Sequence, residues 1–167
     1  MHLRHLITAI LSLALTFGVL GIESCRKVDG EKARKTTVDS LVGRWHIQQG
    51  TGQAIADIYL TFKKGAMATQ QLVLTKGNNR MVASCQGTYT VKSRNIEFKW
   101  DRKTMKFTFN DFAMNNVSAR DREATVADMK ANFVEKGTNA IISLTKDRLV
   151  VCDPEHLNGD ALSYTRE

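Results

Sequence analysis

The chain has 167 residues, a formal net charge of +7, 25% charged residues and a single proline. This composition excludes a disordered or low-complexity chain, and the length favours one domain with an ordinary hydrophobic core. A basic balance fits nucleic acid, an anionic membrane or an acidic partner, but the export signal at the N-terminus argues against nucleic acid. We expect the charge to keep a small protein soluble.

Residues 1–24 have the order of a signal peptide. Arg4 supplies the basic start, residues 6–22 are apolar, and the small Ser24 precedes Cys25. Export signals need this order of basic start, apolar middle and small residue before the cut. An N-terminal membrane anchor that is never cleaved is the alternative.

The end of this segment resembles a bacterial lipobox, in which an aliphatic residue, here Ile22, lies three positions before an obligatory cysteine. The resemblance implies that Cys25 carries lipid, such as palmitate, and that the protein is a lipoprotein of the bacterial cell envelope. We expect it on the periplasmic side of the outer membrane. Stable anchoring needs more than one acyl chain, which a fully processed lipoprotein cysteine has. Residues 25–39 are then a lipidated N-terminus and a basic, solvated tether whose cations could touch anionic head groups.

Residues 40–167 are predicted to form one β domain, because apolar side chains recur with a period of two. Turn signals such as residues 76–79 separate the runs. Many short strands with short connections favour an antiparallel up-and-down β-barrel of eight or nine strands. Gly87, in the middle of a strand, predicts a bend or bulge. The predicted strands are 44–48, 57–62, 67–75, 81–91, 95–100, 104–109, 140–144, 149–152 and 162–165.

The period changes between residues 118 and 135, where apolar residues such as Met129 and Phe133 are spaced by three and four. This spacing predicts one amphipathic helix, with Ser118 as its N-cap and Gly137 as its stop. Because the apolar stripe is narrow, we expect the helix to pack on the barrel or cover one end of it.

Two short motifs resemble the lipocalin family. The run Leu41–Trp45 has the Gly-x-Trp start of a first lipocalin strand. The run Gly87–Val91, followed after a turn by Asn95–Phe98, is similar to the central hairpin of small bacterial lipocalin-like lipoproteins. The likeness extends over residues 41–166. It implies a barrel with an apolar interior, used in some members to hold a small hydrophobic molecule, although animal lipocalins place their helix after the last strand.

The same resemblance implies how the barrel closes. In the lipocalin pattern the indole of the Gly-x-Trp motif, here Gly43 and Trp45, plugs one end, and an arginine from near the end of the last strand lies across it. Leu162, Tyr164 and Arg166 share one phase, so Arg166 is predicted to point inward onto Trp45. A frayed, solvated C-terminus is the alternative.

The leading functional hypothesis is a binding module whose interior accepts a small apolar or amphipathic ligand. A packed interior is the alternative for each lining residue, because side chains can fill an eight-stranded barrel. A packed barrel would favour a protein-interaction module, such as an envelope inhibitor or accessory subunit with an unidentified partner. The candidate lining is Ile58, Leu60, Phe62, Tyr89, Phe98, Trp100, Phe107 and Phe109.

The sequence has no Gly-rich phosphate loop, no Gly-x-Ser-x-Gly and no Cys-x-x-Cys. We therefore expect no enzymatic activity, no cofactor and no metal. His46 is expected on the outer face of the first strand without a function, and His156 in a turn. With Cys25 lipidated, Cys85 and Cys152 are left as a pair. These two cysteines could form a disulfide in an oxidising compartment, or they could remain two buried thiols.

Overall fold

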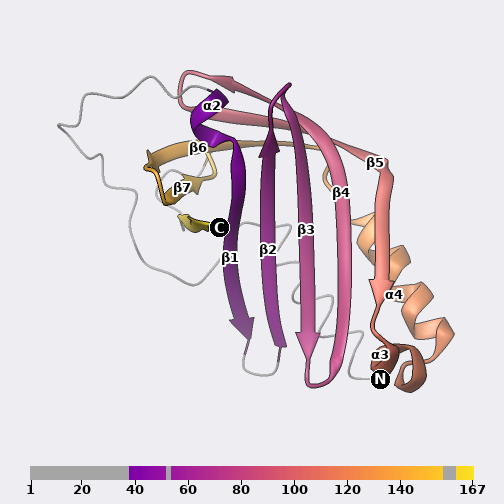
Figure 1. Cartoon of the computed structure of the whole chain (residues 1–167). Helices are drawn as coiled ribbons and strands as arrows, with labels where there is room; N and C mark the ends of the chain where they lie inside the picture. Colours follow the sequence, from indigo (N-terminus) through magenta and orange to yellow (C-terminus); the bar gives the residue numbers. More distant parts are fainter. Residues whose placement is uncertain (1–37, 52–53, 156–160) are drawn as a thin grey trace.

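The computed structural model describes residues 38–51, 54–155 and 161–167, and eight antiparallel strands form a closed barrel within them. The strands are β1 (Gly43–Thr51), β2 (Ala54–Lys63), β3 (Met67–Lys76), β4 (Asn79–Lys92), β5 (Asn95–Phe109), β6 (Lys136–Leu144), β7 (Arg148–Cys152) and β8 (Leu162–Arg166). Each strand pairs with the next, and β8 returns to β1 (Figure 1). The predicted up-and-down barrel is confirmed, with eight strands because residues 95–100 and 104–109 belong to one strand.

Three helices lie among the described residues: α2 (Val38–Leu41), α3 (Asp111–Asn116) and α4 (Ala119–Ala131). The sequence predicts only α4, and its start is correct, since the Ser118 side chain accepts a hydrogen bond from Asp121 N. The predicted end is wrong. The helix ends at its C-cap Asn132, and Gly137 belongs to β6, because the chain in between turns to pair with β5.

The barrel is complete along only part of its height. β1 pairs with β8 at Trp45 and His46, and β5 pairs with β6 along residues 95–99. Residues 47–51 of β1 and 101–109 of β5 have no strand partner on these sides within the described part of the chain. We call the end with the complete ring the closed end, and the remaining sheet of β1 to β5 the open half.

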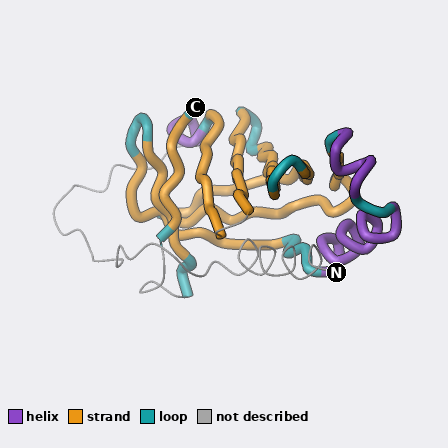
Figure 2. The backbone as a smooth tube through the Cα atoms, turned by 90° about the horizontal axis from the view of Figure 1, so that it is seen from below, coloured by secondary structure: helices purple, strands orange, loops and turns teal. Residues whose placement is uncertain are grey.

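The figures show what surrounds these two parts. The short strands β6 and β7 lie beside the upper part of the long strands, whereas α3 and α4 lie beside the lower part of β5 (Figure 1). Seen from below, α3 and α4 are together on one side of the molecule, and α2 is near the C-terminus (Figure 2). The helices therefore flank the open half on the β5 side, while α2 belongs to the closed end.

An irregularity opposite Cys85 marks the point where β5 leaves β6. On β4 only Cys85 lies at the irregularity, whereas on β5 residues 102–105 lie between the paired positions Asp101 and Lys106. Extra residues on one strand of an antiparallel pair bend that strand and increase its twist. The bend follows directly after the segment of β5 that pairs with β6.

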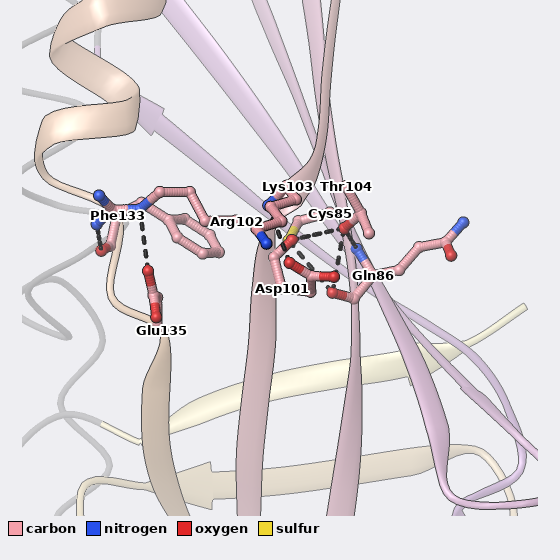
Figure 3. Close-up of polar contacts among 8 residues, drawn as sticks. All are labelled: Cys85, Gln86, Asp101, Arg102, Lys103, Thr104, Phe133 and Glu135. Carbon is pink, nitrogen blue, oxygen red and sulfur yellow. Dashed lines mark hydrogen bonds and ion pairs between the residues drawn. The ribbon is translucent and has the colours of Figure 1, made fainter.

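The Thr104 hydroxyl is the centre of the polar contacts that hold this irregularity (Figure 3). It accepts a hydrogen bond from Gln86 N at 2.8 Å and donates to Asp101 O at 2.7 Å. Lys103 N donates to the Asp101 carboxylate at 3.0 Å, and the Cys85 thiol donates to Asp101 O at 3.3 Å. These bonds give partners to polar groups that the interrupted ladder would leave unpaired.

The contact predicted between Arg166 and Trp45 is present at the closed end. The Arg166 Cζ atom lies 4.4 Å from the Trp45 ring centroid, and the indole is fully buried. Trp45 Nε1 donates to Leu41 O at 2.8 Å, and Arg166 Nη2 donates to Ser40 O at 2.7 Å. Gly43 has φ +144°, and a Cβ there would lie 3.6 Å from Arg166 Nε. The carbonyls of α2 thus fix both members of the pair, which the sequence does not indicate.

Replacing Arg166 by methionine should lower the free energy of unfolding by about 1–2 kcal/mol, because it removes a desolvated cation–π contact. Thermal melting measures the loss, and tryptophan emission in a Trp100→Phe background reports on Trp45 alone. The exposed Arg80→Met variant is the control. A melting temperature and an emission spectrum unchanged by Arg166→Met would show that the contact does not close the barrel.

Replacing Thr104 by valine keeps the shape of the side chain and removes its hydroxyl. We expect the free energy of unfolding to fall by about 0.5–1.5 kcal/mol, the net contribution of a hydrogen bond, since Gln86 N loses its protein partner at this solvent-accessible position. Chemical denaturation measures the change. Thr108→Val, an exposed position on the same strand, should be nearly neutral. Equal effects of the two variants would contradict the role of Thr104.

Candidate functional site

The closed end is filled by aromatic side chains from the predicted lining. Phe62 lies edge-on to Tyr89 with 4.9 Å between ring centroids, and Phe98 stacks on Trp100 at 5.1 Å. Phe62 and Phe98 are 5.9 Å apart, which joins the two pairs into one cluster. Each of these four residues is at most 9% exposed. In this structure they pack against one another as core.

Gly87 has a packing role in this cluster and does not itself bend the strand. It pairs regularly with Ala68 and Trp100, and the irregularity lies at Cys85 instead. A Cβ at Gly87 would lie 2.8 Å from Trp100 Cε3 and 2.5 Å from Lys99 O. A side chain there would displace the indole, so the glycine allows the close approach of β4 and β5.

The inner face of the open half is apolar and less completely covered. Phe107 and Phe109, the other two residues of the predicted lining, are half-buried, as are Ile47 and Met105. Phe107 pairs with Ala83, which places it on the inward face of β5. Buried residues continue this face across the sheet, and Leu60, opposite Trp45, marks its border with the closed end: Ile58, Leu60, Leu72, Leu74, Met81 and Ala83. The predicted lining is therefore divided between a packed end and a partly accessible apolar face.

The segment that follows α4 is fixed against β5 beside this face. Arg102 Nε forms an ion pair with Glu135 at 3.1 Å, and Arg102 Nη2 donates to Phe133 O at 3.3 Å (Figure 3). On α4, Lys130 Nζ lies 5.8 Å from the Phe107 ring centroid. An ammonium group thus borders the aromatic part of the inner face.

The sequence allows either a disulfide or two thiols at Cys85 and Cys152. In the structure no disulfide joins them, and both residues are buried thiols. Cys85 faces inward on β4, whereas Cys152 pairs with Ala140, one position out of phase with the inward Ile141. β5 and β6 separate their strands in the ring, and a disulfide needs Cα atoms within about 7 Å. Burial raises the pKa of the Cys85 thiol, which disfavours its reactive thiolate form.

His46 is part of a polar network on the outer face, which the sequence does not indicate. Its Nε2 lies 2.9 Å from Asp57 Oδ1, and its ring stacks on Tyr59 with centroids 4.6 Å apart. The Arg44 Cζ atom lies 4.1 Å from the Tyr59 ring centroid, and Gln48 donates to Asp57 at 2.9 Å. The cross-strand pairing of His46 with Tyr59 produces this arrangement, and that register is not visible in the sequence.

An open groove of about 690 Å³ lies along β4, β5 and β6. Its lining includes the paired residues Thr88, Lys99 and Lys136, together with residues 153–155. Val134 lines the groove and is 51% exposed. The lining surface of the groove is thus mostly apolar, with contributions from Tyr89 and Phe98, and charged side chains such as Lys99 and Lys136 border it.

The described residues contain no helix long and apolar enough to span a membrane. They also contain no group of three or more His, Cys, Asp or Glu side chains placed to hold a metal ion. The predicted signal segment, Cys25, the tether up to residue 37 and His156 lie outside the described residues. Lipidation and anchoring stay predictions from the sequence.

Comparison with known proteins finds a likeness among solved structures. No protein-family model matches the chain, and no curated protein matches it. Among solved structures, a lipocalin-like protein from Bacteroides uniformis is similar, with 14% sequence identity and a TM-score of 0.46. The likeness covers 77% of this chain and 99% of that one. It is too distant to carry a functional argument, and the strand pairing of this chain itself establishes the barrel.

Proposed function

We propose that the protein is an envelope-anchored binding protein that holds a small apolar or amphipathic ligand on the inner face of the open half. The partly exposed inner side chains carry this proposal, namely Ile47, Met105, Phe107 and Phe109. Burying apolar surface contributes about 25 cal/mol per Å², so a ligand that covers these side chains gains affinity directly. Ligand pockets are usually lined by such apolar and aromatic residues with few polar groups.

A binding role fits the chemistry of the site better than catalysis. The inner face is built mainly from aliphatic and aromatic side chains, and burial raises the pKa of its inward thiol, Cys85, which disfavours the nucleophilic thiolate. The His46–Asp57 pair lies on the outer face of β1 and β2, since it alternates with the inward Trp45 and Ile58. We therefore propose that the protein binds its ligand without transforming it.

Replacing Phe107 by asparagine should weaken binding of 1,6-diphenylhexatriene, a hydrocarbon that fluoresces in apolar surroundings, by about tenfold or more. The reason is that the substitution removes apolar contact area and places an amide in the site. Fluorescence titration of the full chain measures the dissociation constant. Thr108→Asn, the next residue on the opposite face, should leave it unchanged. Equal affinities of the two variants would locate the hydrocarbon elsewhere.

Replacing Cys25 by alanine should abolish membrane retention, because Cys25 is the acceptor that the lipobox-like run 22–25 provides. Cell fractionation after feeding with labelled palmitate measures both retention and acylation. Cys85→Ala, a buried thiol in the barrel, should keep label and retention. Label on the Cys25→Ala protein, or none on the wild type, would contradict the lipoprotein assignment.

A protein-interaction role is the second candidate, and the open groove along β4, β5 and β6 is the observation that favours it. The exposed Val134 and the charged side chains of Lys99 and Lys136 line this groove. Native mass spectrometry of the protein purified from its own membrane distinguishes the two functions. A retained small molecule supports ligand binding, whereas a retained protein without one supports the interaction role.

A further inference from the structure

Gln70 is a polar side chain on the mainly apolar inner face. Its strand neighbours in the same phase, Ala68 and Leu72, are buried in the core. It pairs across the sheet with Leu60 on β2 and with Cys85 on β4, both of which are also core residues. Gln70 therefore points into the barrel, at the level of the irregularity where the closed end meets the open half.

The adjacent Gln71 shows that the alternation of faces holds at this point. Gln71 Oε1 accepts a hydrogen bond from Arg44 Nη2 at 3.4 Å, and Arg44 is an exposed residue of the outer face. Because successive side chains of a strand point to opposite faces, Gln70 faces inward. Of these two adjacent glutamines, Gln71 therefore lies on the outer face and Gln70 on the inner face.

The Gln70 carboxamide has no hydrogen-bond partner among the described residues, and it is not completely buried. Atoms that are fully buried without a partner occur at Asn79 and Arg166, but not at Gln70, which is half-buried. A polar group inside a protein is nearly always hydrogen-bonded, because an unmade bond costs about 1–3 kcal/mol. An accessible, unpartnered carboxamide next to apolar side chains is thus a place where a bound molecule can form hydrogen bonds.

The surroundings of Gln70 define the polar group that it would bind. A carboxamide is neutral and both donates and accepts hydrogen bonds. Leu60, Leu72 and Cys85 beside it carry no charge that would compensate an ion, and burial favours the neutral thiol of Cys85. Gln49 is the other inward carboxamide of β1 to β3. It pairs with Ala56, on the stretch of β1 that does not pair with β8, and so lies away from the level of the irregularity.

We propose that Gln70 is the polar anchor of the binding site and selects ligands with a neutral hydrogen-bonding end group, such as an alcohol or an amide, attached to an apolar body. The end group lies beside Gln70 at the inner limit of the open half, and the apolar body covers Phe107 and its neighbours. This inference rests on the proposed ligand-binding function and adds the chemical class of the ligand.

The test uses 1,6-diphenylhexatriene and its hydroxymethyl derivative, two probes that differ in one hydroxyl group. The wild-type full chain should bind the hydroxymethyl derivative about five- to tenfold more tightly, the effect of one neutral hydrogen bond. Gln70→Leu should abolish this preference and leave the affinity for the hydrocarbon within about twofold. Gln71→Leu is the matched control and should retain the preference.

The results distinguish a failure of the Gln70 anchor from a failure of the ligand-binding function. A preference that persists in Gln70→Leu, or that disappears in Gln71→Leu, overturns the role of Gln70 while leaving the binding function intact. If the wild type binds neither probe, the binding function fails and the anchor with it. Gln70→Met is the second variant should Gln70→Leu not fold, and thermal melting of each variant confirms the fold before titration. Because Gln70 has no partner to lose, we expect both variants to melt at or above the wild-type temperature.

Discussion

The irregularity between β4 and β5 is the feature on which the rest of the architecture depends. Before it, β5 pairs with β6, and the ring is complete. After it, β5 carries Phe107 and Phe109 alongside β4 but away from β6, and the inner face there is only partly covered. The polar contacts of Thr104 and Asp101 stabilise the irregularity at which this change takes place.

Under the proposed function, stability and binding consequently belong to different parts of one barrel. The closed end has the fully buried side chains of Trp45, Phe62 and Tyr89 and the contact of Arg166 with the indole. A carbonyl from α2 holds each member of that pair, so the first and last strands are joined at the point where they meet. A rigid, well-packed end of this kind can support a neighbouring face whose apolar side chains are left for a ligand.

The sequence predicts the strands well, because the alternation of apolar side chains is a local signal. The phase of Leu162, Tyr164 and Arg166 is enough to direct Arg166 inward. The continuity of β5 is not predictable in the same way, since the polar run 101–104 looks like a turn and acts as a bulge. The helices α2 and α3, of four and six residues, are too short to show a period.

The candidate site is predicted only in part, because alternation gives the face of a residue and not its level in the barrel. Phe62 and Phe107 have the same inward phase, yet one is packed core and the other is partly accessible. The level depends on which strands pair beyond each position, and those partners are distant in the sequence. The face on which Cys152 lies is not predictable from the sequence for a related reason. All residues from Leu149 to Cys152 are buried, so burial there does not identify the inward phase.

Gln70 and Gln71 illustrate why a polar binding group inside a barrel escapes composition-based reasoning. Side by side in the sequence, the two residues resemble an ordinary polar segment of a strand. Strand alternation separates them: one carboxamide bonds to Arg44 on the outer face, and the other lies between Leu60 and Cys85 without a partner among the described residues. An unmade hydrogen bond is a cost at a packed position but a specific contact where a ligand can reach it. Because the inner face is only partly covered next to the bend, the Gln70 carboxamide stays accessible, and the proposed anchor role depends on that accessibility.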